Sequence, residues 1–248
     1  MKNDTLKKIT SQRLFLPIFC LALVLLVNVI TTPNFFAISV RDGVLYGYII
    51  DIINRASELV ILAIGMTLVV SSSAGTDISV GAIMAVSAAV CCNILSGAER
   101  AATEFANPLI LGFLAALAVG ILIGCFNGFL VSKLNIQPMV ATLIMFTAGR
   151  GIAQLITDGQ ITYVRVDSYK ILGSSFPGVP VPTPFIVAVV LVVVTAVILK
   201  KTALGMYIQS VGINKRASRL IGIKSVMIIF LTYAYCGLCS GLAGLIAS

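Results

Sequence analysis

The chain has 248 residues, of which 59% are hydrophobic and only 10% are charged, and a soluble domain of this length could not bury so much apolar surface. It contains no histidine, which removes the commonest general base and metal ligand. It also lacks the G-x-x-x-x-G-K-[ST] motif that holds ATP in a P-loop. We therefore predict a membrane protein with no metal or cofactor of its own, and an enzyme acting by itself is disfavoured.

Long uncharged runs divide the chain into segments suited to crossing a bilayer as helices, each of which takes about 20 apolar residues. The runs are continuous and do not alternate between polar and apolar residues, so a transmembrane β-barrel is excluded. We predict an all-α, polytopic helical bundle of about seven spans that forms a single membrane domain over residues 1–248. The runs cover residues 14–40, 59–76, 78–98, 105–132, 134–149 (continuing to about 157), 171–199 and 225–248.

Basic residues are concentrated on one side of this predicted bundle, whereas acidic residues lean to the other. Positive charge collects on the cytoplasmic side of membrane proteins, so we expect the amino terminus, Lys133 and the segment 200–224 to be cytoplasmic. This asymmetry also accounts for the net charge of +8 without a nucleic-acid partner. The basic residues assigned to the inner side are Lys2, Lys7, Lys8, Arg13, Lys133, Lys200, Lys201, Lys215, Arg216, Arg219 and Lys224.

The two ends of the chain carry one expectation each. The first apolar run is too long for a signal peptide and no A-x-A cleavage site follows it, so we expect a retained membrane anchor. The last run stops at Ser248 without a polar tail. We therefore expect the membrane domain to be truncated at its carboxyl end.

Only Gly75-Thr76-Asp77 separates the second and third runs. This short link predicts either a tight hairpin at the inner face or a break inside the membrane. Asp77 precedes an apolar run, where a carboxylate can cap the next helix by accepting hydrogen bonds from its free amide groups. In the alternative, the ends of broken helices line a substrate cavity and Asp77 belongs to it.

The fourth run contains five small residues at a spacing of four, which places them on one face of a helix. Small residues let membrane helices approach closely and pack. Glycine is common in membrane helices, but five small residues in register favour a packing seam within or between subunits. The seam residues are Gly112, Ala116, Gly120, Gly124 and Gly128.

The fifth run and its continuation carry a row of polar residues. Thr147, Arg150, Gly151, Gln154 and Asp158 are three or four positions apart, so they share one helical face. A charge at the middle of a bilayer costs roughly 2.5–3.5 kcal/mol on insertion scales and usually faces a wet cavity or the bundle interior. Arg150 could instead extend its side chain to the outer surface. The other polar residues on this face favour a polar path.

The segment 200–224 contains six basic residues and no acidic one. Asn214 is a suitable N-cap and Gly222 a suitable C′ residue for a helix of about two turns, on which Ala217, Leu220 and Ile221 share a face. An isolated helix in water needs roughly 12–15 residues, so this one must dock on something. A protein partner and anionic membrane lipid, which attracts basic residues, are both suitable surfaces.

Several stretches together resemble the permeases of bacterial sugar ABC importers of the ribose, galactose and arabinose type, and within that family the galactofuranose branch. The resemblance covers nearly the whole chain. It rests on AIGMTLVV at 63–70, DISVG at 77–81, NG at 127–128, IQPMVATL at 136–143, GRG at 149–151, TALG at 202–205, GIN at 212–214 and GI at 222–223, and, for the branch, on DIINRA at 51–56, QLIT at 154–157 and VGIN at 211–214.

The resemblance implies a multi-pass protein of the bacterial inner membrane that moves a monosaccharide, galactofuranose in that branch. It implies a pore of two permease subunits, identical or different, with cytoplasmic ABC ATPases and a periplasmic sugar-binding protein. It places a cytoplasmic coupling loop at 200–225. The implied ATPase-coupling residues are Gly205, Gly212, Asn214, Ala217, Arg219, Leu220, Ile221 and Gly222, and the expected substrate path contains Asp77, Asn127, Arg150, Gln154 and Asp158.

A second hypothesis from a different class stays open at this point. A secondary transporter would use an intramembrane carboxylate, Asp77 or Asp158, as its proton site. Co-purification with an ATPase and uptake that resists uncouplers would distinguish the two.

Overall fold

The computed structural model describes residues 15–41, 44–97, 99–175 and 179–248. Lys2, Lys7, Lys8 and Arg13, on which the predicted cytoplasmic amino terminus depends, lie outside the described residues. The described part is mainly helical, which confirms the predicted helical membrane bundle. Its helices are α2 (Phe15–Thr31), α3 (Tyr48–Ser73), α4 (Val80–Ser96), α5 (Leu109–Ser132), α6 (Pro138–Ile156), α7 (Asp167–Gly173), α8 (Thr183–Lys201), α9 (Leu204–Ile213), α10 (Lys215–Leu220) and α11 (Ser225–Ala247).

Each of the seven apolar runs forms a helix. Among the described residues, α3, α5, α6, α8 and α11 are long and apolar enough to cross a membrane. The helices α2 and α4 have 17 residues each and are shorter. The predicted count of seven spans therefore depends on these two helices.

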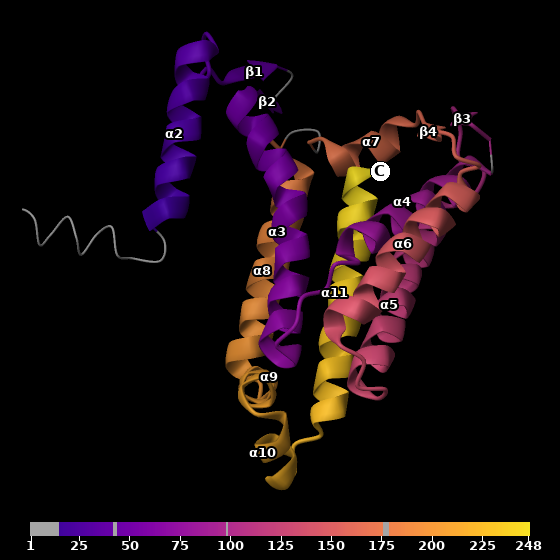
Figure 1. The fold of residues 1–248 in the computed structure, drawn as a ribbon. Coiled ribbons are helices and arrows are strands. Elements are labelled where there is room, and N and C mark those ends of the chain that lie inside the picture. Colours follow the sequence, from indigo (N-terminus) through magenta and orange to yellow (C-terminus); the bar gives the residue numbers. More distant parts are fainter. Residues whose placement is uncertain (1–14, 42–43, 98, 176–178) are drawn as a thin grey trace, which may run out of the picture.

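Four short strands lie near one end of the bundle, together with α7 (Figure 1). The strands β1 (Ser39–Arg41) and β2 (Val44–Tyr46) form an antiparallel hairpin between α2 and α3. The strands β3 (Ala101–Ala102) and β4 (Tyr163–Val164) are parallel. The opposite end carries α9 and α10, with the loop between α5 and α6, and we call it the base.

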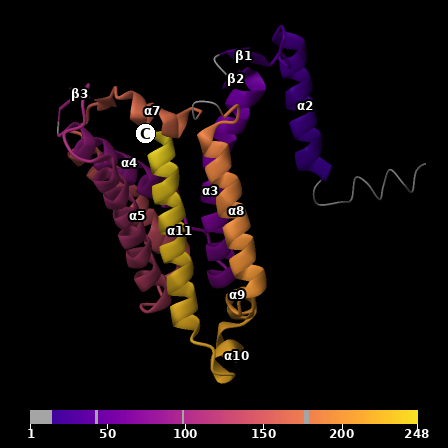
Figure 2. The same ribbon diagram turned by 180° about the vertical axis from the view of Figure 1, so that it is seen from behind.

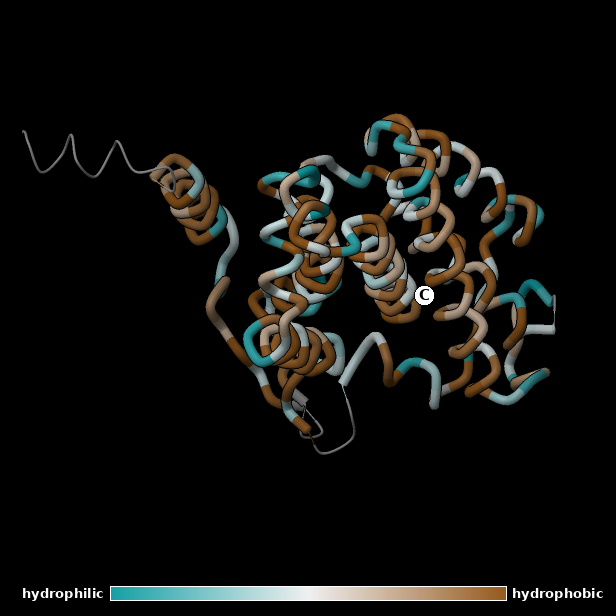
Figure 3. The backbone as a smooth tube through the Cα atoms, turned by 90° about the horizontal axis from the view of Figure 1, so that it is seen from below, coloured by the Kyte–Doolittle hydropathy of each residue, from teal (hydrophilic) through white to brown (hydrophobic). Residues whose placement is uncertain are grey.

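The helix α11 lies between two groups of helices (Figures 1 and 2). It packs against α5 and α4 on one side and against α3 on the other, and α8 packs on α3. The view along the bundle shows α11 between these groups, with the mainly hydrophobic α2 standing apart (Figure 3). None of the residues of α2 is buried. The core is therefore built around α11.

The contact between α5 and α11 is made by glycines. A Cβ atom added at Gly120 would lie 2.6 Å from the carbonyl oxygen of Gly237, and one at Gly124 would lie 2.5 Å from the carbonyl oxygen of Tyr233. Real Cβ atoms do not approach so closely, so any side chain at these positions must push the helices apart. The small-residue ridge of α5 thus faces α11 of the same chain, while Gly112 at its other end faces Leu95 of α4.

The ridge generates a prediction about stability. Gly120→Ala and Gly124→Ala should each destabilise the folded protein by roughly 1–3 kcal/mol, because overpacking forces the backbone to shift. Thermal unfolding in detergent measures this. Gly151→Ala on α6 is the matched control, since nothing lies within 4 Å of its added Cβ and alanine favours helix. If all three variants unfold together with the wild type, the close α5–α11 contact is not what holds the bundle.

Candidate functional site

The segment between α3 and α4 is a break inside the bundle. Ala74 ends α3 with a left-handed φ of 52°, and a Cβ at Gly75 would clash with Pro138, the first residue of α6. The chain then rises between the helices before α4 begins at Val80 (Figure 1). Of the two forms that the sequence allowed, the structure has an internal break.

Side chains of α5 and α6 hold this break in place. Asn127 donates from Nδ2 to Oγ of Ser79 at 2.8 Å, and the amide of Ile78 donates to Oγ1 of Thr142 at 3.1 Å. Asn127 lies five residues before the end of α5 and Thr142 four residues after the start of α6, which is about 6–8 Å from the base at the usual helical rise. The break therefore occupies the interior, and α4 is short because it begins there.

Asp77 is 1% exposed and is part of the same network. Its Oδ1 accepts from the amide of Ser79 at 2.8 Å and from the Ser79 hydroxyl at 2.6 Å. Ser79 is itself the N-cap of α4, so Asp77 stabilises the turn before that helix and does not bind the amides of its first turn. Asn127 and Thr142 are fully buried as well. These buried side chains hold the turn before α4 and face no open surface.

The polar face of α6 lies elsewhere. Arg150, Gln154 and Asp158 are exposed and are not brought together with Asp77 and Asn127. The guanidinium of Arg150 lies 4.5 Å from the ring centre of Phe146, a distance at which a cation is attracted to an aromatic face. Asp158 lies just past α6 with a left-handed φ of 50°.

Gln154 contributes to a hollow of about 350 Å³ between α4 and α6. Ala85, Ala88 and Cys92 of α4 line it together with Thr157. Small side chains on α4 leave this space open. The predicted polar face of α6 thus borders this hollow through Gln154.

Two helices form the base. α9 runs across the bundle axis, and α10 lies beyond it (Figures 1 and 2). Ile208 and Val211 of α9 are buried, and a Cβ at Gly212 would collide with the backbone carbonyl of Ser71 in α3. Gly205 likewise leaves no room for a side chain, because the carbonyl of Leu199 in α8 lies against it.

The six-residue α10 has the caps that its sequence suggests. Oδ1 of Asn214 accepts from the amides of Arg216 and Ala217, both at 3.0 Å. Gly222 follows the helix with a φ of 88°, a conformation that glycine adopts without strain. We did not predict α9 from the sequence, although Leu204, Ile208 and Val211 have the spacing of a helical face.

Apolar side chains of α10 point away from the chain. Leu220 is 89% exposed and Ile221 is 75% exposed, and Ala217 is exposed beside them. Ile213, which precedes the cap, is exposed as well. The described chain leaves these apolar side chains uncovered.

Two basic residues of α10 hold the helix against the bundle. Nζ of Lys215 donates to Oδ1 of Asn135 at 3.0 Å, and Nε of Arg219 donates to Oγ of Ser225 at 2.8 Å. Burial lowers the pKa of Lys215, and the neighbouring Arg219 lowers it further. A single sequence offers no signal for these two partners.

These features define a class: a polytopic helical membrane protein with an internal helix break and a small capped helix exposed at one end. The chain belongs to the family described as "Branched-chain amino acid transport system / permease component", whose model matches residues 48–248. No solved structure matches the chain.

Curated relatives cover most of the chain. It is 45% identical to the galactofuranose transporter permease protein YtfT of Escherichia coli (strain K12). The 228 aligned residues are 92% of this chain and 64% of that protein. It is 39% identical to the fructose import permease protein FruF of Bifidobacterium longum (strain NCC 2705), over 99% of this chain and 68% of the relative. It is 35% identical to the ribose import permease protein RbsC of Escherichia coli (strain K12), over 91% of this chain and 67% of the relative.

The chain thus spans about two thirds of the length of these relatives. The resemblance predicted from the motifs, a sugar ABC importer permease, is confirmed. The alternative of a secondary transporter with a proton site at Asp77 or Asp158 gains no support from these relatives.

The cap of α10 generates a prediction. Asn214→Ala should weaken the helix by roughly 0.5–2 kcal/mol, because the amides of Arg216 and Ala217 lose their acceptor. Hydrogen exchange of the 215–223 peptide should then be faster by roughly 2- to 30-fold. Asn214→Asp keeps the acceptor oxygen and should exchange like the wild type. Equal exchange in all three proteins would show that the cap does not support α10.

Proposed function

We propose that this chain is the membrane permease subunit of a bacterial ABC importer in the inner membrane, which moves a monosaccharide and is powered by a separate ATPase. The observation that carries the proposal is the exposed apolar surface of α10 in a member of this permease family. A helix of six residues has no stability of its own in water. A cytoplasmic ATPase is a partner that would cover it.

The substrate class follows from the relatives. Those described above are named for galactofuranose, fructose and ribose, whereas the family description names branched-chain amino acids. We favour a sugar because the named relatives cover nearly the whole chain, and galactofuranose because that relative is 45% identical. A periplasmic sugar-binding protein and a second permease subunit, identical or different, would complete the importer.

Contacts at the base suggest how ATPase movement would reach the substrate path. α10 is tied to the α5–α6 loop through Lys215 and Asn135. α9 contacts the end of α3 where Gly212 meets Ser71. The segment 74–79 joins that end of α3 to α4 and is held by α5 and α6. Movement of α10 would therefore act on both sides of the break.

The substrate path in this proposal follows the surface of α6 that carries Arg150, Gln154 and Asp158. Asp77 and Asn127 would act on it from inside, because they set the position of the break at which α4 begins. A sugar presents hydroxyl groups, and amide, carboxylate and guanidinium groups are suitable partners for them.

Substitutions of Arg150 test the proposed substrate path. Arg150→Leu should lower sugar uptake in cells several-fold without lowering the amount of inserted protein, because removal of a charge favours membrane insertion. Arg150→Lys keeps the charge and should retain more uptake. Uptake by the leucine variant at the wild-type level would mean that Arg150 only extends to the membrane surface.

The coupling surface has a test of its own. Leu220→Asp places a charge in the apolar surface of α10 and should abolish sugar uptake by the assembled importer, with loss of the ATPase or of its coupling. Uptake, ATP hydrolysis and co-purification of the ATPase measure this.

Arg216→Glu is the matched control, because it changes charge on the same exposed helix outside the apolar surface. It should retain most of the uptake, since charges at a rim affect association more than the docked state. If Leu220→Asp transports normally, α10 does not dock on the ATPase. If the control fails only in membranes rich in anionic lipid, α10 is a lipid anchor.

A further inference from the structure

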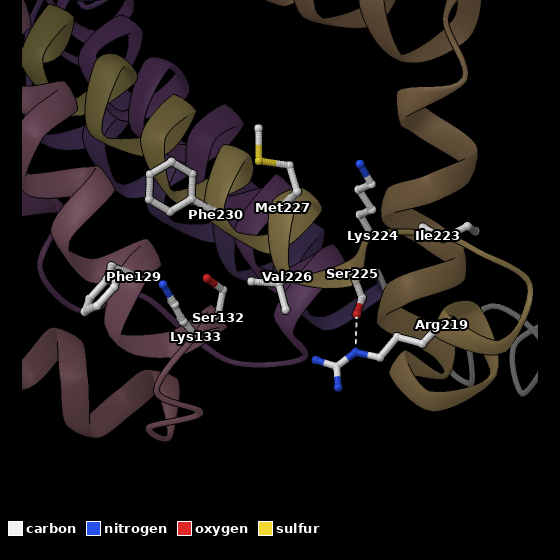
Figure 4. A pocket seen from close by; sticks show the side chains of 10 residues that line it. All are labelled: Phe129, Ser132, Lys133, Arg219, Ile223, Lys224, Ser225, Val226, Met227 and Phe230. Carbon is white, nitrogen blue, oxygen red and sulfur yellow. Dashed lines mark hydrogen bonds between the residues drawn. The ribbon is translucent and has the colours of Figure 1, made fainter.

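A pocket of about 530 Å³ opens at the base between the end of α5 and the start of α11 (Figure 4). Three basic residues from three separate segments line it: Lys133 after α5, Arg219 on α10 and Lys224 just before α11. The rest of its lining is mostly apolar. No acidic residue is among those that line it.

The positive charges in this pocket are not neutralised within the described chain. Arg219 uses Nε in its bond to Ser225, and in Figure 4 its two Nη atoms point away from Ser225. Nζ of Lys133 lies 5.7 Å from the ring centre of Phe129. Three positive charges around one pocket without a counter-charge raise the positive potential there. The pocket is therefore suited to an anion.

The apolar wall extends along the helices away from the charges. Phe129 lies one turn before the end of α5, and Phe230 lies five residues into α11, or about 7–8 Å along the axis. Met227 lies three residues before Phe230 on α11 and is half exposed. A soluble anion would satisfy the cations but leave this wall uncovered. A cytoplasmic protein would reach the cations but not the part of the wall at the depth of the bilayer.

We propose that this pocket binds one anionic phospholipid, with its phosphate against Lys133, Arg219 and Lys224 and an acyl chain along Phe129, Met227 and Phe230. Basic residues next to membrane helices attract anionic headgroups. The proposal shares with the proposed function only the orientation that places the base on the cytoplasmic side.

The bound lipid would also position α10. Its phosphate would join Arg219 of α10 to Lys133 at the end of α5, in addition to the bond between Arg219 and Ser225. The helix that we expect to meet the ATPase would thereby be held at a defined height relative to the membrane surface.

The experiment measures lipid retention by the purified protein. Native mass spectrometry in detergent compares phosphatidylglycerol with phosphatidylethanolamine of the same acyl chains. The wild type should retain phosphatidylglycerol preferentially. Lys133→Gln with Lys224→Gln should weaken retention by on the order of 25-fold, from roughly 1 kcal/mol for each lysine.

The matched control is Lys200→Gln with Lys201→Gln. It removes the same charge near the base from residues that do not line the pocket, and it should retain phosphatidylglycerol as the wild type does. Equal loss of phosphatidylglycerol from both double variants would overturn the proposal, because binding would then depend only on overall charge. Equal retention of the two lipids by the wild type would also overturn it, because binding would then not depend on the charge of the lipid.

Soluble glycerophosphoglycerol, the same headgroup without acyl chains, distinguishes a lipid from a free phosphate. It should compete at least a hundredfold less well than the lipid, because it leaves the apolar wall exposed. Competition at equal concentration would overturn the lipid assignment. Lipid binding can be tested separately from ATPase docking, because Leu220 does not line the pocket. The Leu220→Asp variant should therefore retain phosphatidylglycerol although it loses sugar uptake.

Discussion

Backbone atoms of α5 and α11 touch because Gly120, Gly124 and Gly237 place no side chain between the two helices. In a bilayer, lipid tails are as apolar as leucine, so helices gain little from hydrophobic burial and associate through close packing. The α5–α11 contact supplies that packing at the centre of the bundle. Because α11 also packs on α3 and α4, its position determines where both groups of helices lie.

A second requirement is that backbone amides and carbonyls inside a membrane find partners. In the break at 74–79, Oδ1 of Asp77 accepts from the amide of Ser79 and Oγ1 of Thr142 accepts from the amide of Ile78. Non-helical backbone at that depth is tolerated where protein covers it or where it lines a cavity, and transporters place such breaks at their substrate paths. The break therefore joins the packing of the bundle to its proposed activity.

The sequence predicted local features well and their partners poorly. The apolar runs predicted the helices, and the spacing from Gly112 to Gly128 predicted a packing face, because both depend on periodicity within one segment. It did not distinguish a seam within the chain from one between subunits, since that depends on which helix faces the glycines. Asn214 and Gly222 have the geometry that their residue types suggest.

The candidate site was harder to predict from the sequence. The choice between a hairpin and a break depends on Asn127 and Thr142, which are distant in sequence from the segment 74–79. For the same reason, the partners of Lys215 and Arg219 could not be foreseen.

The central claim is that this chain works as part of an importer driven by ATP. The most direct measurement is uptake of labelled galactofuranose into proteoliposomes that contain the permease, its ATPase and the sugar-binding protein. The account predicts uptake that requires ATP on the side of the base and is unchanged when an uncoupler removes the proton gradient. Uptake that proceeds without ATP and stops with the uncoupler would contradict it.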